Sequence, residues 1–331
     1  MISEAIFSLN SSMPLQEFIA WAVCSLRDLY PEPEARNMVD ILLEERTGRK
    51  SWFAIAHPDF ELCAAELAGL KDDVARLCTG EPLQYVLGFA WFYSRRFRVN
   101  PAVLIPRPET EILVDFVLQR LADTAYSHPA ASQGVGDSSC QGSGSSCQVS
   151  GKGVAPRILD LCTGSGCIAW TLALECPNAS VTALDISRAA LALARTQFES
   201  GSVVFVEADV LDLSEKGISG DCSEMGLGKF DVIVSNPPYV MDKEKSQMRT
   251  NVLDYEPSIA LFVPDDDPLI FYRAIAHHAT RMLTDRGWGI VEINSLLAEQ
   301  TADCFRTAGF PTVNILPDLS GRPRFVHFSR I

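Results

Sequence analysis

An amide side chain followed by two prolines and an aromatic ring is the part of this sequence with the clearest chemistry. The tetrapeptide Asn236-Pro237-Pro238-Tyr239 comes directly after the strand-like run 230–235. Proline fixes φ and carries no N–H, so the backbone there is rigid and offers only carbonyl acceptors, and Asn236 adds a side-chain carbonyl oxygen. Such a corner could hold an –NH2 group by both hydrogens while its nitrogen lone pair points elsewhere. The plainer interpretation is a proline-rich turn that closes a strand, and the flanking sequence decides between the two.

A glycine turn after another strand-like run, 158–161, is the second candidate for chemistry. It reads Cys162-Thr163-Gly164-Ser165-Gly166. Glycines at the first strand-to-helix turn let a ligand approach the backbone near the helix N-terminus. A Gly-x-Gly pattern alone is consistent with NAD, FAD or S-adenosylmethionine. The turn is short and lacks the further glycines that cradle a pyrophosphate, which favours adenosylmethionine because this ligand has no phosphates.

Acidic residues end the next two predicted strands. Asp185 lies about 20 residues after the glycine turn, where an acid can accept hydrogen bonds from both ribose hydroxyls of a nucleoside. The alternative role for Asp185 is to cap the helix that begins near Ser187, and one side chain could do both. Asp209 could meet an adenine amino group, and Val210 could pack on the adenine ring. These residues therefore predict a nucleoside site.

The elements that must position these residues alternate between strand and helix from residue 157 onward. Strands are expected over 158–161, 181–184, 203–206, 232–235, 289–293 and 325–328. Helices are expected over 168–176, 187–198, 269–283 and 296–308. Such alternation predicts a doubly wound α/β domain with a largely parallel sheet and ligands at the carboxyl ends of its strands.

The region before this domain has a different pattern. Helical periodicity predicts a small bundle over 1–80, with helices at 14–30, 33–46 and 61–78. Residues 81–106 change to β character, with strand-like runs at 84–88, 91–93 and 97–99, which predicts a hairpin that joins two domains. Residues 127–153 and, more briefly, 214–229 are rich in Ser and Gly and are expected to be disordered insertions.

Composition limits the class of protein. The 331 residues carry a net charge of -14, which argues against a protein that coats nucleic acid. The ten cysteines are scattered without a Cys-x-x-Cys pair, so reduced thiols are expected and neither a metal site nor a disulfide framework. We see no signal peptide and no apolar run long enough to cross a bilayer, and we therefore expect a cytoplasmic protein.

Together these features make the chain resemble the release-factor glutamine methyltransferases, the HemK/PrmC family. The resemblance covers most of the chain and rests on Glu81-Pro82-Leu83-Gln84-Tyr85, residues 104–111 (Leu-Ile-Pro-Arg-Pro-Glu-Thr-Glu), the Thr-Gly-Ser-Gly turn, Asn-Pro-Pro-Tyr, Tyr255-Glu256-Pro257 and Asp318-Leu319-Ser320-Gly321. The Arg-Pro-Glu-Thr-Glu run separates it from similar enzymes that modify a ribosomal protein. The chain departs from the family in Cys162, where members often carry glycine, and in a longer insertion before the first strand of the α/β domain.

The resemblance implies a class I methyltransferase (Rossmann-like) domain over 107–331, and an N-terminal bundle that recognises the release factor. It implies adenosylmethionine on residues 162–166, Asp185, Asp209, Val210 and Asn236. It also implies that residues 236–239 bind the substrate glutamine, which belongs to the Gly-Gly-Gln motif of class 1 peptide chain release factors. A monomer that makes no direct contact with nucleic acid or membrane is expected.

Three other functions remain to be weighed. A DNA adenine-N6 methyltransferase faces the same chemical problem but needs a basic recognition domain, which this acidic chain lacks. Glutamine methylation of a ribosomal protein is the second. The third is a binding module without activity, and the intact Asn236 and glycine turn argue against it. Arg107, Glu109 and Glu111 are expected either to order the rim of the cofactor pocket or the domain junction, or to form structural salt bridges.

Overall fold

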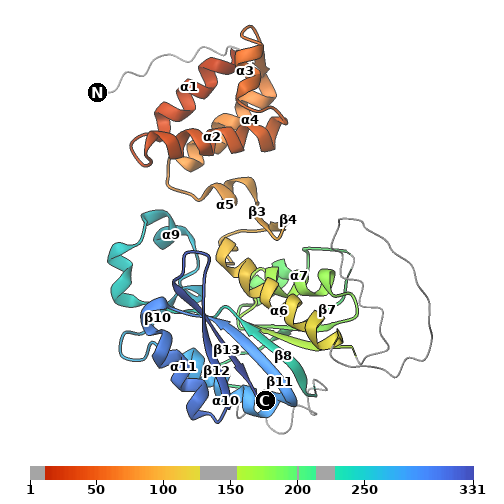
Figure 1. Cartoon of the computed structure of the whole chain (residues 1–331). Coiled ribbons are helices and arrows are strands. Elements are labelled where there is room, and N and C mark those ends of the chain that lie inside the picture. Colours follow the sequence, from red (N-terminus) through yellow and green to blue (C-terminus); the bar gives the residue numbers. More distant parts are fainter. Residues whose placement is uncertain (1–11, 127–154, 200, 214–227) are drawn as a thin grey trace, which may run out of the picture. The chain divides into compact units, whose positions relative to one another are not determined.

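A computed structural model describes residues 12–126, 155–199, 201–213 and 228–331 of the chain (Figure 1). The chain divides into two compact units, which are described separately here. The smaller unit comprises residues 1–89 and 249–255, and the larger comprises residues 90–248 and 256–331. The expected insertion at 127–153 and most of the one at 214–229 lie outside the described residues.

The larger unit is built on a seven-stranded sheet with the order β12-β13-β11-β8-β5-β6-β7. Its strands are β5 (Arg157–Leu161), β6 (Ser180–Asp185), β7 (Val203–Glu207), β8 (Phe230–Ser235), β11 (Leu283–Glu292), β12 (Thr312–Pro317) and β13 (Pro323–Ser329). Strands β5, β6, β7, β8 and β11 run parallel, whereas β13 is antiparallel to both β11 and β12. The prediction of a doubly wound, mostly parallel mixed sheet is confirmed.

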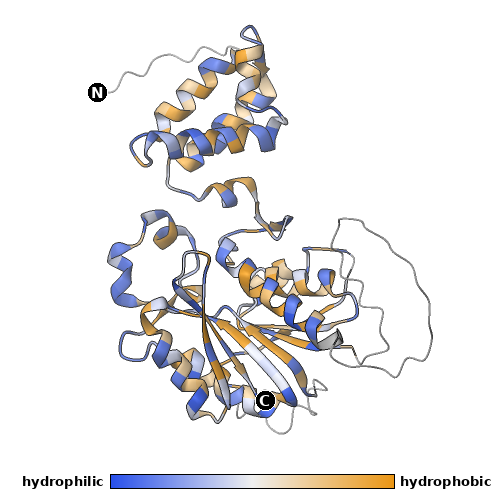
Figure 2. Cartoon of the chain, in the orientation of Figure 1, coloured by the Kyte–Doolittle hydropathy of each residue, from blue (hydrophilic) through white to orange (hydrophobic). Residues whose placement is uncertain are grey.

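Helices cover both faces of this sheet (Figure 1). On one face, α10 (Ile270–Met282) and α11 (Ala298–Thr307) share a core with Leu159 and Ile233. On the other face, α6 (Pro108–Tyr126) and α7 (Cys167–Glu175) share a core with Ile158 and Val232. Neighbouring strand residues therefore enter opposite cores, which explains why these strands are hydrophobic along almost their whole length (Figure 2). The remaining helix on this sheet, α8 (Arg188–Ala194), contacts β6 and β7.

The hairpin before the sheet is partly as expected. Strands β3 (Phe89–Phe92) and β4 (Arg95–Arg98) pair as predicted. The strand predicted at 84–88 was wrong, because Leu83–Leu87 form the short helix α5. Pro82 precedes this helix and Gly88 ends it in the left-handed conformation at φ 84°, a pair of signals that favours helix termini.

The smaller unit is a helical bundle, as expected. Its helices are α1 (Leu15–Leu26), α2 (Glu32–Thr47), α3 (Trp52–Ala56), α4 (Ala64–Leu77), the short α5 and α9 (Thr250–Tyr255). All of these helices except α9 contribute to a core of buried apolar side chains that includes Phe18, Leu42 and Leu70. Residues 61–63, expected at the start of a helix, instead form strand β2 (Glu61–Cys63), which pairs with β1 (Ser12–Pro14).

Helix α9 belongs to this unit although it comes from late in the chain. Arg249 forms an ion pair with Glu34, and the hydroxyl of Tyr255 lies 2.7 Å from that of Thr79. The sequence gives no local signal for this association.

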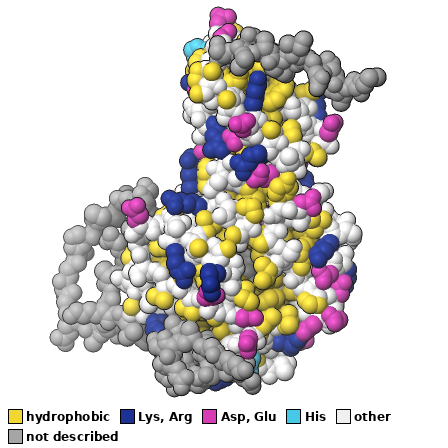
Figure 3. All heavy atoms as spheres, turned by 180° about the vertical axis from the view of Figure 1, so that it is seen from behind, with side chains coloured by type: hydrophobic (Ala, Val, Ile, Leu, Met, Phe, Trp, Pro, Cys, Tyr) yellow, Lys and Arg dark blue, Asp and Glu magenta, His cyan; other side chains and the backbone are white. Residues whose placement is uncertain are grey.

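The remaining elements are short. They are β9 (Val240–Met241), β10 (Phe262–Val263) and the 3-10 turns η1 (Asp242–Gln247), η2 (Ser258–Ala260) and η3 (Ser295–Leu297). None of the helices in the described part of the chain has the length and apolar character needed to cross a membrane. In the space-filling view, hydrophobic side chains run down the middle of the visible face of the larger unit, and acidic side chains gather along its right edge (Figure 3).

Candidate active site

A cavity opens in the larger unit where strands β5, β6, β7 and β8 end. Its volume of about 220 Å³ far exceeds the roughly 10–15 Å³ that one water requires by this measure. Of the residues predicted for the site, the cavity wall contains Cys162, Thr163, Gly164, Ser165, Asp185, Asp209, Val210, Asn236 and Pro238. Gly166, Pro237 and Tyr239 are not part of the wall. The topology therefore brings together most residues of two motifs that lie about 70 positions apart in the sequence.

The glycine turn between β5 and α7 has an unusual backbone. Cys162, Gly164 and Gly166 all have positive φ, at 60°, 54° and 79°. A Cβ added at Gly164 would meet no atom within 4 Å, whereas one at Gly166 would lie 3.1 Å from Trp170. At Gly164, glycine is therefore favoured by the left-handed backbone conformation alone, and at Gly166 also by the close packing against Trp170. Cys162 adopts the same left-handed conformation although it carries a side chain.

Asp185 at the end of β6 fixes this turn. Its carboxylate accepts the backbone N–H of Gly164 and of Ser187, both at 2.8 Å. The Ser187 hydroxyl itself caps helix α8 by accepting the N–H of Ala190. Burial raises the pKa of Asp185 above its ordinary value, although the backbone hydrogen bonds oppose that shift. Asp185 thus supports the turn and the start of α8, and each oxygen keeps a lone pair for a ligand.

The corner after β7 provides one polar and one apolar wall residue. Asp209 accepts the backbone N–H of Leu211 at 2.8 Å, which holds the turn. Val210 is buried, and its carbonyl oxygen lies 3.1 Å from Nε2 of His278 on α10. Both residues line the cavity, and their contact with an adenine ring stays a prediction.

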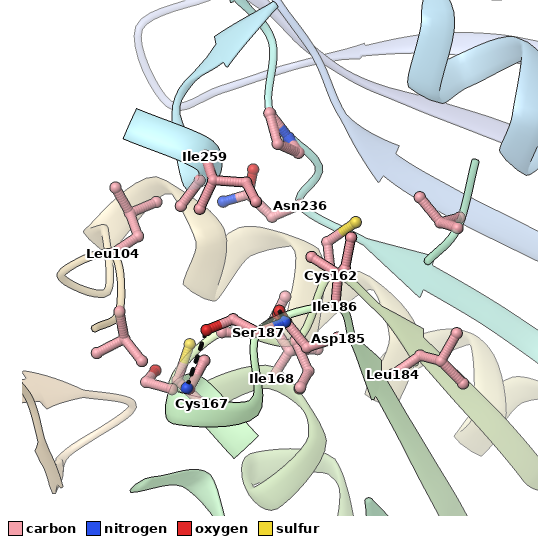
Figure 4. A pocket seen from close by; sticks show the side chains of 18 of the residues that line it. Leu104, Cys162, Cys167, Ile168, Leu184, Asp185, Ile186, Ser187, Asn236 and Ile259 are labelled. Carbon is pink, nitrogen blue, oxygen red and sulfur yellow. Dashed lines mark hydrogen bonds between the residues drawn. The ribbon is translucent and has the colours of Figure 1, made fainter. Parts of the chain in front are cut away.

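Apolar residues that the sequence did not single out complete the wall. Leu184, Ile186, Ile259, Phe271 and Leu104 line the cavity. Ile259 is 60% exposed, which places it at the mouth. Figure 4 shows Asn236 and Ile259 on one side of the cavity and Cys167 and Ile168 on the opposite side. Leu184 lies in strand β6 and Phe271 in helix α10, whereas Leu104 and Ile186 lie outside helices and strands.

The rim loop before α6 is held by an ion pair. The guanidinium of Arg107 lies 2.7 Å from the carboxylate of Glu256, which also accepts the backbone N–H of Ile105. Arg107 also lines the cavity. It therefore forms a structural salt bridge and orders the rim of the pocket at the same time, the two roles predicted for it. Glu111 instead accepts the backbone N–H of Tyr93, whose φ is 50°.

A buried hydrogen-bond network lies behind Asn236. The Nδ2 of Asn236 donates to Oγ1 of Thr110 at 3.2 Å, and the Thr110 hydroxyl donates to Glu292 at 2.7 Å. The Tyr239 hydroxyl donates to the other oxygen of Glu292 at 2.9 Å. Burial raises the pKa of both Glu292 and Tyr239. The sequence analysis missed Thr110 and Glu292, and no spacing signal connects them because they lie 182 residues apart.

Comparison with known proteins identifies the family of the chain. The family model "Methyltransferase small domain" matches residues 148–254, and "PrmC N-terminal domain" matches residues 17–88. The release factor glutamine methyltransferase of Bacteroides thetaiotaomicron is 36% identical over 92% of this chain and 96% of its own length. The chain belongs to the release factor glutamine methyltransferase family. A second member, from Koribacter versatilis, is 35% identical over 89% of this chain and 91% of its own length.

Two further matches describe the range of this family. A bifunctional methyltransferase of Rickettsia bellii is 36% identical to this chain. The match covers 91% of this chain and 51% of the Rickettsia protein. Among solved structures, the release factor-specific protein-(glutamine-N5) methyltransferase of Alicyclobacillus acidocaldarius is 25% identical, with a TM-score of 0.38 over 71% of this chain and 99% of that one. The curated relatives and the family models confirm the predicted family, fold and methyltransferase class of this chain.

Proposed function

We propose that this protein transfers a methyl group from S-adenosylmethionine to the side-chain amide nitrogen of the glutamine in the Gly-Gly-Gln motif of class 1 peptide chain release factors. The observation that carries the proposal is that Asn236 and Pro238 share one cavity with the glycine turn and Asp185. An acceptor of amide hydrogens thus lies beside a nucleoside-type site. The N-terminal bundle is proposed to recognise the release factor, and the protein to act as a monomer.

The cavity suits adenosylmethionine in shape and charge. Asp185 has free lone pairs for ribose hydroxyls, Asp209 and Val210 suit an adenine ring, and the left-handed turn at residues 162–166 leaves its backbone open to a ligand. The one basic side chain in the described wall, Arg107, is paired with Glu256. The two wall carboxylates therefore favour a positively charged ligand.

When bound, adenosylmethionine supplies a reactive methyl group on a positively charged sulfur. The contribution of the protein is to prepare the amide nitrogen, a poor nucleophile because its lone pair is delocalised into the carbonyl. The Asn236 Oδ1 and the Pro237 carbonyl each accept one hydrogen of the glutamine –NH2, which leaves the lone pair free to point at the methyl group. Tyr239 packs against the glutamine side chain, and the nitrogen releases its proton after the transfer, so that no general base is needed beforehand.

Two physical effects account for the rate. Alignment of the reacting groups can contribute several of the roughly 7–11 kcal/mol available from proximity. Acceptors that strengthen as the nitrogen becomes positive stabilise the transition state more than the ground state.

The test uses labelled adenosylmethionine and three acceptors. These are a class 1 release factor, the same factor with the Gly-Gly-Gln glutamine replaced, and duplex DNA. Label on the first alone supports the proposal. Label on DNA identifies an adenine methyltransferase instead, and label on the factor without its glutamine places the modification elsewhere. A ribosomal-protein extract serves as a fourth acceptor and tests the remaining alternative.

A further inference from the structure

The orientation of the Asn236 carboxamide decides whether the corner can work. The side chain carries an oxygen acceptor at one position and an NH2 donor at the other, and the two positions have almost the same size and shape. Only the orientation with Oδ1 toward the substrate can accept a hydrogen from an –NH2 group. The opposite orientation would place two sets of donors against each other.

Thr110 selects between these orientations because its hydroxyl has only one hydrogen. That hydrogen is donated to Oε2 of Glu292 at 2.7 Å. Toward Asn236 the Thr110 oxygen can therefore only accept, and it receives Nδ2 at 3.2 Å. The carboxamide oxygen is thus left for the cavity.

Glu292 keeps the hydroxyl of Thr110 in this direction. Its two oxygens accept from two hydroxyls, that of Thr110 on α6 and that of Tyr239 after β8. Glu292 is 1% exposed and Thr110 is 2% exposed, so water does not compete for these hydrogen bonds. Burial raises the pKa of this carboxylate, whereas the hydrogen bonds from Thr110 and Tyr239 and the positive charge of Arg324 on β13 oppose that shift and favour the ionised form.

We propose that Thr110 and Glu292 are positioning residues for methyl transfer: they fix the Asn236 carboxamide with its oxygen toward the substrate amide. This inference rests on the proposed function. Neither residue contacts the reacting atoms in the proposal, and both act through Asn236.

The kinetic test compares Thr110→Val with Thr110→Ser. Valine keeps the shape and removes the hydroxyl, and we expect kcat on the release factor to fall tenfold to a hundredfold while cofactor Kd stays within twofold. Serine restores the hydroxyl and should retain at least half of the wild-type kcat. Glu292→Gln should also lower kcat. An amide at this position can donate a hydrogen bond to the Thr110 oxygen, and the Thr110 hydroxyl hydrogen is then free to turn toward Asn236.

Thr301→Val is the matched control. Thr301 is a fully buried threonine on α11 whose hydroxyl has no hydrogen-bond partner within the described residues, and its replacement should leave kcat unchanged. In an Asn236→Ala background, Thr110→Val should change kcat by less than twofold. An equal loss in both backgrounds, or wild-type kcat in Thr110→Val, overturns the inference.

A second measurement needs no substrate and separates this inference from the proposed function. Hydrogen exchange of the Asn236 side-chain amide can be followed by NMR on protein labelled at asparagine, with the signal assigned by its loss in Asn236→Ala. We expect exchange at least tenfold faster in Thr110→Val than in wild type or Thr301→Val. Unchanged exchange overturns the inference even if the release factor is methylated. If exchange is faster in Thr110→Val but the wild-type protein does not methylate the release factor, the positioning role of Thr110 is supported and the proposed function is wrong.

Discussion

The carboxylate of Asp185 accepts the backbone N–H of Gly164 at 2.8 Å, which joins the end of strand β6 to the turn that follows β5. The other oxygen of Asp185 accepts the N–H of Ser187. One side chain therefore ties two strand ends together at the floor of the cavity. The sequence predicts a ligand role for this acid, and the structure adds that the turn depends on it.

Replacement of Asp185 by Asn should weaken cofactor binding tenfold to a hundredfold. An amide has a single acceptor oxygen, so one backbone N–H would lose its partner, and hydrogen bonds to charged groups contribute about 1.5–3 kcal/mol. Titration calorimetry with adenosylmethionine measures the effect. Glu207→Gln is the control, because Glu207 ends the neighbouring strand β7 but pairs with the exposed Arg188. Equal Kd values for the two variants would contradict a binding role for Asp185.

Replacement of Asn236 by Ala should lower kcat by about 10²–10³, the typical cost of removing one preorganised hydrogen-bonding group from a transition state. The Kd of the cofactor should stay within a few-fold of the wild-type value. Steady-state methylation of a release factor gives the first quantity and calorimetry the second. Asn314→Ala, on the exposed side of strand β12, should leave both values unchanged. Wild-type turnover in Asn236→Ala would falsify the proposed mechanism.

Cys162 should respond to substitution in the opposite way from Cys167. Cys162 has a φ of 60°, where residues other than glycine lose roughly 1–2 kcal/mol, so Cys162→Gly should be about 1 kcal/mol more stable than Cys162→Ala. Cys167 is the first residue of helix α7, and there glycine should be less stable than alanine by up to about 1 kcal/mol. Urea unfolding of the four variants measures both differences. If the Gly variant were more stable than the Ala variant at both positions, or less stable at both, backbone conformation would not explain the difference between Cys162 and Cys167.

The buried acid Asp160 should make stability depend on pH. Burial raises its pKa to about 7, with the nearby Asp185 adding to the shift and the hydrogen bond from Thr163 opposing it. An acid whose pKa is higher in the folded protein contributes its full stability below the unfolded value near 4, and this contribution is lost as the pH rises toward 7. Between pH 5 and pH 8, wild-type protein should therefore lose on the order of 2 kcal/mol more than Asp160→Asn. Urea unfolding at both pH values measures this difference. An equal change in unfolding free energy between pH 5 and pH 8 in wild type and Asp160→Asn would exclude the proposed titration.

The sheet was predictable because its strands carry strong local signals. Residues 158–161 and 232–235 are apolar apart from Asp160 and Ser235 and are buried on both faces, and the residues that follow them determine where each strand ends. Helix α6 and strand β12 were not among the expected elements. The sequence Pro-Glu-Thr-Glu at the start of α6 is an ordinary helix beginning, with proline and acidic residues in the first turn, although no helix is predicted there. Strand β12 is a short sheet edge that ends in proline.

The site was predictable only in part, for a related reason. Residues in the glycine turn and the Asn-Pro-Pro-Tyr corner are contiguous, so each motif can be recognised by itself. Thr110 meets Asn236 at a sequence separation of 126, Glu292 meets Tyr239 at a separation of 53, and Thr110 and Glu292 are themselves 182 residues apart, so only the topology of the sheet brings them together. Helix α5 was mistaken for a strand because Tyr85 and Val86 favour β structure, whereas their burial in this chain and the flanking Pro82 and Gly88 stabilise a helical turn.

The two prolines after Asn236 also determine which side chain the corner rejects. Neither proline has an N–H, and the Nδ2 of Asn236 is turned toward Thr110, which accepts one of its hydrogens. On the proposed function, a glutamine that had hydrolysed to glutamate would present a negatively charged carboxylate of nearly the same size to the oxygen lone pairs of Asn236 and Pro237. Deamidated release factor would therefore remain unmethylated, and the methyl mark would report that the amide is still intact.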